Sequence, residues 1–146
     1  MKLDKKDLQI LGLLEQDSSL STQKISKKTH IPITTVHNRI KKLQKIGVIE
    51  RFTVKINQEK LGNLISAFLM IDVDSSSKSD EIDQKQIIKK LNHLDEVETA
   101  YIVTGITDIM AKVNVKGIKE LNELILEKIR KIHGLETQTM IILEEK

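Results

Sequence analysis

Residues 33–45 carry the side chains of this 146-residue sequence that are best suited to bind another molecule. Val36, Ile40 and Leu43 recur at spacings of four and three, which predicts a helix from Ile33 to Lys45 with one apolar face. The rest of this helix presents hydrogen-bonding and basic groups, namely Thr34, Thr35, His37, Asn38, Arg39, Lys41, Lys42 and Lys45. Such a helix fits the major groove of B-DNA, where side chains near its N-terminus reach base edges.

Two kinds of DNA contact are expected from this region. Asparagine can bond adenine through two hydrogen bonds, and a threonine methyl can contact thymine. The candidate base readers are therefore Thr34, Thr35, His37 and Asn38. Contacts to phosphate position a protein without reading sequence, and we expect them from Ser21, Thr22, Lys24, Lys41, Lys42 and Lys45. Two residues have alternative roles, Thr35 as a helix cap and Arg39 as an ion-pair partner of Asp7.

Two shorter helices must position this one. Asp4 is a good N-cap for a first helix over residues 5–15, where leucine and isoleucine recur at helical spacing. Ser21 or Thr22 can cap a second helix of about two turns, over residues 22–28. Two short helices followed by a polar third one match the helix-turn-helix pattern.

The boundaries of the third helix are marked by proline and glycine. Residues that precede a proline avoid the helical region, so Pro32 separates the second and third helices and is expected at the first helical position. Gly47 is expected to end the third helix as its left-handed cap. The alternation over residues 48–56 then predicts a strand pair or ribbon, the wing of a winged helix.

Charge separates the chain into two parts. Residues 1–60 hold 13 Lys and Arg against 6 Asp and Glu, a net charge of +7, whereas residues 61–146 hold 11 against 15, a net charge of −4. No acidic residue occurs between Asp17 and Glu50, and this stretch of 32 residues holds seven bases. A solvated lysine-rich face would account for some of these bases. A surface that binds a polyanion accounts better for the missing carboxylates.

The second part has the element order βαββαβ. Strands are predicted over 64–73, 97–103, 109–115 and 137–143, and helices over 87–94 and 118–132, the latter ended by Gly134. This is the ferredoxin-like arrangement, with both helices on one face of the sheet. The fold class is therefore α+β, a winged helix-turn-helix domain over 1–60 with a connecting strand, and a ferredoxin-like domain over 61–146. Met70, Ile102, Met110 and Ile141 predict an apolar second face that is buried against another copy.

Several classes of protein lose support from the composition. The chain has no cysteine, its four histidines show no metal-ligand spacing, and it has neither a phosphate-binding glycine loop nor a nucleophile elbow, so no cofactor, metal or catalytic residue is expected. Aromatic content of 2% leaves the sheet without the stacking residues of RNA-binding sheets. No apolar run approaches the length of a membrane span, and we expect a cytoplasmic protein.

The chain resembles the leucine-responsive/asparagine regulator (Lrp/AsnC) family over its whole length. The resemblance rests on Leu3-Asp4 with Asp7, Ile10-Leu11 and Leu14, on Thr35-Val36 with Arg39-Ile40 and Leu43, on Gly47-Val48-Ile49, and on the Gly-x-x-Asp hairpin Thr104-Gly105-Ile106-Thr107-Asp108. It implies a transcription regulator that forms homodimers through the αβ domain and often tetramers or octamers. It also implies an amino acid or related metabolite as effector near the hairpin.

The effector-site candidates are Thr104, Gly105, Thr107, Asp108, Thr137 and Thr139. Gly105 would let a ligand approach backbone amides, and Asp108 could pair with an amino group. The alternative is that Gly105 and Asp108 make the turn, and that the two threonines of the last strand are ordinary strand residues. The sequence departs from the family at Pro32, where a capping serine is usual, and at Ile106-Thr107, where an acidic–aromatic pair is usual.

Two other functions fit parts of the sequence. Basic residues and self-association alone would suit an architectural protein that compacts DNA with little sequence preference. Some tetrapyrrole decarboxylases resemble the family in both domains, and a catalytic cavity would need His or Arg facing an anionic substrate. The αβ half offers Arg130, His93 and His133 for that role and leaves the basic helix without a purpose. A sequence-specific regulator accounts for both halves.

Overall fold

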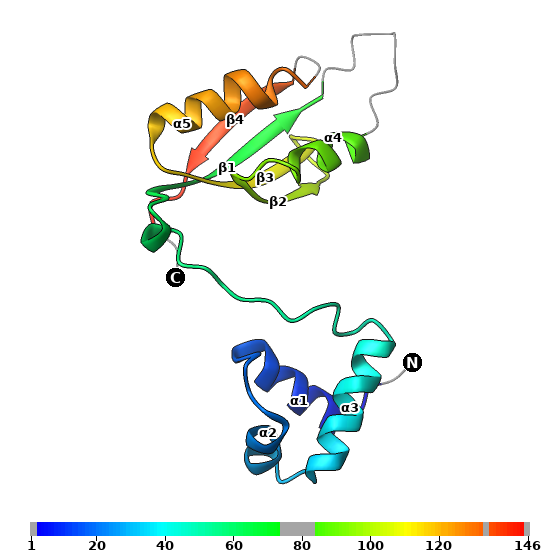
Figure 1. The fold of residues 1–146 in the computed structure, drawn as a ribbon. Helices are drawn as coiled ribbons and strands as arrows, with labels where there is room; N and C mark the ends of the chain where they lie inside the picture. Colours follow the sequence, from blue (N-terminus) through cyan, green and yellow to red (C-terminus); the bar gives the residue numbers. More distant parts are fainter. Residues whose placement is uncertain (1–2, 74–83, 133–134, 145–146) are drawn as a thin grey trace. The chain divides into compact units, whose positions relative to one another are not determined.

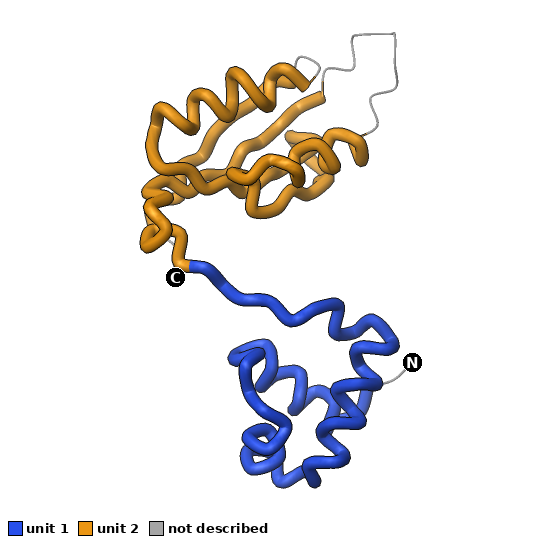
Figure 2. The backbone as a smooth tube through the Cα atoms, viewed as in Figure 1, with its two compact units in different colours: residues 1–56 blue, residues 57–146 orange. Residues whose placement is uncertain are grey.

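The computed structural model describes residues 3–73, 84–132 and 135–144, which form two compact units. Unit 1 comprises residues 1–56 and unit 2 comprises residues 57–146 (Figure 2). The boundary lies four residues before the one expected from the sequence. No helix among the described residues is long and apolar enough to cross a membrane.

Unit 1 is a bundle of three helices (Figure 1). They are α1 (Lys5–Gln16), α2 (Thr22–Thr29) and α3 (Ile33–Lys45). Ile10, Leu14, Ile25, Ile31 and Val36 form its buried core, with contributions from all three helices and from the turn between α2 and α3. The helical periodicity of the sequence therefore selects the buried residues directly, since each apolar face points inward.

The turn between α2 and α3 fixes the direction in which α3 leaves the bundle. His30 caps α2 in the left-handed conformation, with φ of 57°, a region that non-glycine residues seldom adopt. Pro32 was expected at the first helical position and is instead the N-cap of α3, with extended backbone (ψ of 140°) and no side chain that can cap. Gly47, with φ of 74°, ends α3 in the left-handed conformation, as expected.

The predicted wing does not form within this chain. Residues 50–57 have no regular secondary structure, so the prediction of a strand pair over 48–56 was wrong. The alternating apolar side chains of this segment, Phe52, Val54 and Ile56, are all exposed. A strand requires a neighbour that accepts its backbone hydrogen bonds, and a single extended segment provides none. The hydroxyl of Ser18 donates to the Thr53 carbonyl at 3.1 Å and holds this segment beside the loop after α1.

Unit 2 has the predicted βαββαβ order. A short 3-10 helix (Glu59–Leu61) precedes β1 (Ile65–Asp72), α4 (Gln84–Leu91), β2 (Val97–Ile102), β3 (Ile109–Val115), α5 (Ile118–Glu123) and β4 (Glu136–Ile141). The strands form one antiparallel sheet in the order β2-β3-β1-β4 (Figure 1). The predicted long helix changes character, since α5 continues as a π-helix over Leu124–Ile129. Its predicted end at Gly134 lies outside the described residues.

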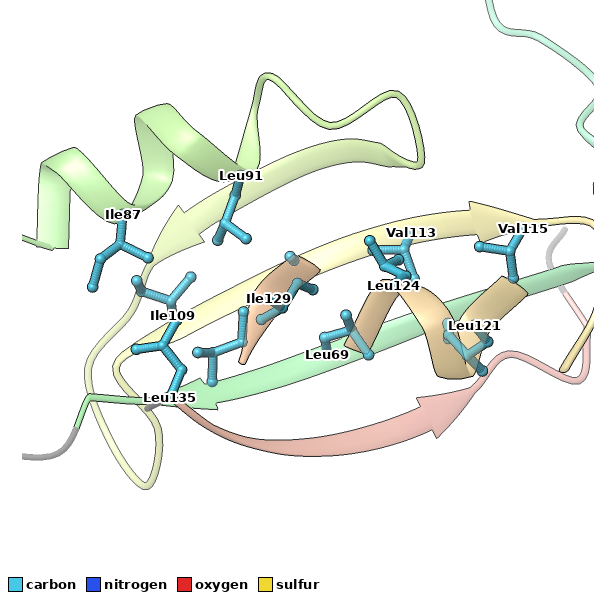
Figure 3. Close-up of a cluster of buried hydrophobic side chains, with 13 residues drawn as sticks. Leu69, Ile87, Leu91, Ile109, Val113, Val115, Leu121, Leu124, Ile129 and Leu135 are labelled. Carbon is cyan, nitrogen blue, oxygen red and sulfur yellow. The ribbon is translucent and has the colours of Figure 1, made fainter. Parts of the chain in front are cut away.

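Both helices of unit 2 pack on the same face of the sheet. Ile87 and Leu91 from α4 meet Ile109 from β3, while Leu121 from α5 and Leu124 pack with the other strand residues (Figure 3). The core residues of the two central strands, β1 and β3, alternate along each strand, as Ala67, Leu69 and Ile71 do in β1. Within unit 2, no described element covers the second face of the sheet.

The uncovered face differs by one residue on each edge strand from the predicted one. Met70 and Met110 lie on it, as predicted, and they are register partners in β1 and β3. Ile102 and Ile141 were expected there, but they pair with the core residues Ile109 and Ala67 and so point to the helix-covered face. Their neighbours take the places instead, which gives an apolar surface of Phe68, Met70, Tyr101, Met110 and Met140. A shift of one residue exchanges the faces of a strand, and only pairing with a fixed neighbour decides the shift.

Candidate nucleic-acid interface

The outward face of α3 collects the predicted base readers. Thr34, His37 and Asn38 are exposed, whereas Val36 and Leu43 on the opposite side are buried. Lys41, Lys42 and Lys45 continue the exposed face toward the C-terminal end of the helix. Thr35 is half-buried on the flank, and the N-cap of α3 is Pro32, so Thr35 does not take the capping role that was its alternative. The face thus has polar hydrogen-bonding groups in its first turns and positive charge behind them.

Arg39 has a different environment from the other polar residues of α3. Its Nη1 donates to both carboxylate oxygens of Asp4, at 2.7 and 2.6 Å, and to Oδ1 of Asp7 at 2.7 Å. The Asp7 side chain is only 1% exposed, so the pair is largely withdrawn from solvent. The ion pair with Asp7 that the sequence offered as an alternative therefore forms, and Asp4 joins it.

The two aspartates are held in place by the first turn of α1. The Asp7 backbone amide donates to Asp4 Oδ1 at 3.0 Å, and the Asp4 amide donates to Asp7 Oδ2 at 3.2 Å, which is a capping box. The guanidinium of Arg39 thus bridges the N-terminal end of α1 to the middle of α3. Because α3 carries the exposed polar face, this bridge fixes its orientation on the bundle.

The ion pair shifts the pKa values of both Asp4 and Arg39. The hydrogen bond from Arg39 holds the pKa of the Asp4 carboxyl below its usual value, with a smaller contribution from the Asp7 amide. The same hydrogen bond to Asp4, followed by the one to Asp7, raises the pKa of Arg39. Asp4 and Arg39 are consequently both charged throughout the neutral range.

The start of α2 carries three of the residues predicted to contact phosphate, Ser21, Thr22 and Lys24. Ser21 is the N-cap of α2, and its Oγ accepts from the Lys24 amide at 3.3 Å, so its hydroxyl hydrogen can still donate outward. Thr22 is half-buried at the first helical position, and Lys24 is exposed. Lys27 and Lys28 are also exposed on α2 and extend the basic surface beyond the predicted set. The absence of acidic residues from 18 to 49 was the signal for them.

The hairpin between β2 and β3 has an open tip and a buried base. Thr104, Gly105 and Ile106 are exposed, and Gly105 has φ of 131°, a conformation that L side chains rarely adopt. No atom lies within 4 Å of the position that a Cβ of Gly105 would take. Thr107 is buried instead, and its hydroxyl donates to the Ile71 carbonyl at 3.0 Å. The tip therefore exposes backbone, whereas Thr107 fastens the hairpin to β1.

Asp108 is engaged by the protein itself. Its Oδ2 accepts from the Val73 amide at 2.9 Å, and its Oδ1 accepts from Gln84 Nε2 at 3.1 Å. Asp108 thus connects the hairpin to the end of β1 and to the start of α4. Gln84 was not among the predicted site residues, because nothing in its local sequence distinguishes it from other helix-surface glutamines.

The two threonines of β4 differ in how close they lie to the hairpin. Thr137 pairs with Ile71, whose carbonyl also accepts from Thr107, so β4 and the hairpin meet at this residue. The Thr137 hydroxyl accepts from Arg130 Nε at 3.2 Å. Thr139 lies two residues further along, opposite Leu69, and is exposed. In the parts of the chain that the structure describes, no group of three His, Cys, Asp or Glu residues could hold a metal ion.

The comparisons with known proteins agree with both units. Residues 3–50 match the family model for winged helix-turn-helix DNA-binding domains, and residues 66–146 match the Lrp/AsnC ligand binding domain. An HTH-type transcriptional regulator from Pyrococcus horikoshii is 38% identical over 147 residues, which cover 100% of this chain and 89% of that protein. The HTH-type transcriptional regulator FL11 from Pyrococcus furiosus is 36% identical, over 97% of this chain and 90% of FL11.

Two solved structures extend the similarity to the fold. LrpC from Bacillus subtilis superposes with a TM-score of 0.86 at 26% identity, over 100% of this chain and 98% of that one. The feast or famine regulatory protein of Mycobacterium tuberculosis, solved in complex with L-methionine, gives a TM-score of 0.86 at 26% identity, over 99% and 94%.

A helix-turn-helix unit with a basic exposed helix, joined to a ferredoxin-like unit, defines a DNA-binding transcription regulator. The chain belongs to the Lrp/AsnC family. The expected family and the α+β fold class are thereby confirmed.

The bridge between α1 and α3 makes a prediction about acid stability. Replacing Arg39 by alanine should lower the unfolding temperature of unit 1 by several degrees at neutral pH, because the buried Asp7 carboxylate loses its cation. The pKa of Asp4 is depressed in the folded state. The stability that the Asp4 carboxylate contributes is therefore complete above about pH 3.9, the usual pKa of an aspartate, and is lost as the pH falls through the lower pKa of the folded state. The difference between the two proteins should therefore shrink in acid.

The measurement is thermal unfolding of the full chain, followed by far-ultraviolet circular dichroism from neutral pH into the acid range. Lys42→Ala, an exposed cation on the same helix, serves as the control and should leave the unfolding temperature nearly unchanged. A difference between wild type and Arg39→Ala that stays constant with pH would contradict the assigned role of the aspartates.

Proposed function

We propose that this regulator reads a specific DNA sequence through α3 and holds the backbone through the surrounding hydroxyl and basic residues. The observation that carries the proposal is the exposed face of α3, where Thr34, His37 and Asn38 precede three lysines with no acidic residue nearby in sequence. Direct readout is assigned to Thr34, Thr35, His37 and Asn38, and phosphate contact to Ser21, Thr22, Lys24, Lys41, Lys42 and Lys45. Arg39 is left out, because its guanidinium is engaged by Asp4 and Asp7.

Substitution of Asn38 and of Lys45 should have different signatures. Asn38→Ala should reduce affinity for the preferred sequence about tenfold or more and leave binding to scrambled DNA unchanged, because it removes a base contact. Lys45→Ala should weaken both equally and reduce the slope of log affinity against log salt by about one, because it removes a phosphate contact. Fluorescence anisotropy with a sequence selected from a random pool provides both measurements.

The control for this experiment is Lys119→Ala, which removes an exposed lysine from α5 in unit 2. It should leave both DNA affinities unchanged. Wild-type protein that enriches no sequence from the pool, yet binds with strong salt dependence, would favour the architectural, DNA-compacting function over sequence-specific regulation.

The second proposal is a homodimer joined through the uncovered sheet face. Phe68, Met70 and Met110 are partly shielded there, whereas Tyr101 and Met140 are 57% and 45% exposed. An apolar surface of this kind on a sheet is normally covered, and an isologous contact lets one surface cover an identical one. Family resemblance supports further assembly into tetramers or octamers.

Met110→Glu should convert the dimer to a monomer, because it places a charge on β3, a central strand of the proposed interface. Sedimentation velocity of the full chain measures the change, and circular dichroism verifies that the fold persists. Leu126→Glu alters an exposed apolar residue (42%) of the π-helix, away from the sheet face, and should leave the dimer intact. A Met110→Glu protein that is folded and still dimeric would rule out this interface.

The third proposal is that an amino acid binds at the hairpin and modulates the regulator. The match to a ligand-binding domain and the methionine complex of the M. tuberculosis relative support it. Among the predicted residues, Thr104 and Gly105 expose the backbone on which a carboxylate can bind. Thr107, Asp108 and Thr137 shape the site from behind, since their side chains already hydrogen-bond within the protein. Thr139 completes the set on the exposed part of β4.

A panel of L-amino acids, with methionine first, should raise the unfolding temperature of the full chain. Ligand at 100 times its Kd stabilises a protein by about 2.7 kcal/mol, which corresponds to a shift of several degrees. Gly105→Val should abolish the shift, because it strains the hairpin tip and fills the open space above it. Gly62→Val introduces similar strain (φ of 89°) outside the hairpin and should retain the shift. No shift with any amino acid would remove support for this effector class.

The supported role is therefore that of a regulator and not of an enzyme, acting in the cytoplasm where its DNA is found. Asp108 and Arg130, two ionisable side chains at the hairpin end of the sheet, are both bonded within the protein. Turnover of a tetrapyrrole by the purified chain would contradict this assignment.

A further inference from the structure

Gly12 lies in the middle of α1, where a glycine lowers helix stability relative to alanine. Its backbone is not in the left-handed region, and no atom lies within 4 Å of the position that a Cβ would take. Neither the conformation nor the packing of unit 1 therefore requires a glycine there. A glycine at such a position leaves room for close approach by another helix.

Gly12, which is half-buried, shares one face of α1 with three exposed residues. Lys5, Leu8, Gly12 and Glu15 follow one another at spacings of three, four and three, so they lie on one side of the helix. We refer to them as the α1 face. Leu8 is 58% exposed, and neither Leu8 nor Gly12 belongs to the core cluster of unit 1. Within the described part of the chain, Lys5 and Glu15 form no ion pair.

The two charges of the α1 face are unfavourably placed with respect to the dipole of α1. A cation in the first turn and an anion in the last turn both oppose the helix dipole. Lys5 is the first residue of α1 and Glu15 is the last but one. These positions become favourable if each charge meets an opposite charge on another molecule.

The α1 face is complementary to itself in an antiparallel arrangement. The pair Lys5 and Glu15 and the pair Leu8 and Gly12 have the same midpoint, Ile10. When two copies of α1 cross antiparallel at this midpoint, Lys5 of each copy faces Glu15 of the other. Leu8 of each copy then faces Gly12 of the other, and the missing Cβ gives room for the leucine. A two-fold contact requires this reciprocity.

We propose that the α1 face is the contact between the helix-turn-helix units of two copies of this chain, with α1 paired antiparallel. This inference rests on the proposed homodimer and adds a second contact to the sheet interface. Its consequence is functional, because Arg39 ties α3 to the start of α1. Pairing of the two α1 helices then fixes the separation of the two α3 helices, and so the spacing of the half-sites that the dimer can bind.

Cross-linking of the full chain tests the contact, since the chain has no cysteine of its own. In the antiparallel pair the two copies of Leu8 are four residues apart along the axis, about 6 Å. Leu8→Cys should therefore cross-link rapidly with a short bis-maleimide. Lys6→Cys, exposed on a different side of α1, is the matched control and should cross-link slowly.

Charge reversal in the Leu8→Cys background distinguishes a specific contact from chance proximity. Lys5→Glu or Glu15→Lys alone places like charges opposite each other twice per dimer and should slow cross-linking about fivefold or more. The double substitution restores opposite charges and should recover the original rate. Each single substitution gives a charge that interacts favourably with the helix dipole, so slower cross-linking cannot be attributed to a less stable helix.

Gly12→Ala gives a second readout that a purely structural role would not produce. It should raise the unfolding temperature of unit 1 by a few degrees and still slow the cross-linking of Leu8→Cys. The proposal is overturned if Leu8→Cys cross-links no faster than the control, or if the double charge reversal fails to restore the rate.

Sedimentation of the same variants separates this result from the sheet dimer. Slow cross-linking in a chain that sediments as a dimer overturns the α1 contact alone. Rapid, charge-dependent cross-linking in the Met110→Glu protein would establish the α1 contact without the sheet interface. A chain that sediments as a monomer and does not cross-link would overturn both.

Discussion

The guanidinium of Arg39 connects the start of α1 to the middle of α3, the helix proposed to contact DNA. It donates to two carboxylates that a capping box has already fixed at the first turn of α1, and it comes from the middle of α3. A buried carboxylate is costly without a cation, so the pairing admits little freedom in how α3 lies against α1. The opposite side of α3 packs in the apolar core and carries the ion pair of Arg39 with the aspartates of α1. The polar face of α3 is therefore exposed in one defined direction.

This arrangement assigns different duties to charges that look alike in the sequence. Arg39 and the neighbouring lysines lie within seven residues of one another, and all of them would suit a phosphate. Arg39 is half-buried and paired with Asp4 and Asp7, whereas Lys41, Lys42 and Lys45 are exposed. One guanidinium nitrogen, Nη1, donates to both aspartates, and a planar group that is always charged suits this bridging position. The proposed phosphate contacts of the lysines require only their charge.

The hairpin of unit 2 combines two structural roles in one segment. The Gly-x-x-Asp segment is both a turn and the anchor of one end of the sheet, since Thr107 and Asp108 bond to the end of β1. The two interpretations that the sequence left open, a turn or a ligand site, are therefore not exclusive. The base of the hairpin makes the turn rigid, and the tip at Gly105 remains open. A rigid, open loop is a suitable place for a small ligand, because little entropy is lost on binding.

The sequence by itself determined the helices, the order of the elements, the family and the exposed face of α3. Apolar residues at helical spacing select the same buried face in isolation and in the folded unit, as Val36 and Leu43 show. The tertiary structure decided which face Ile102 and Ile141 occupy, because the pleat alternates with a period of two and only the pairing partner sets the register. It also decided that residues 50–57 form no wing within this chain, because a strand needs a neighbour that accepts its backbone hydrogen bonds. The hydrogen bonds of Arg39 and Gln84 to carboxylates distant in sequence likewise depend on the tertiary structure. Local periodicity is written in the chain, whereas pairing between distant residues exists only once the chain has folded.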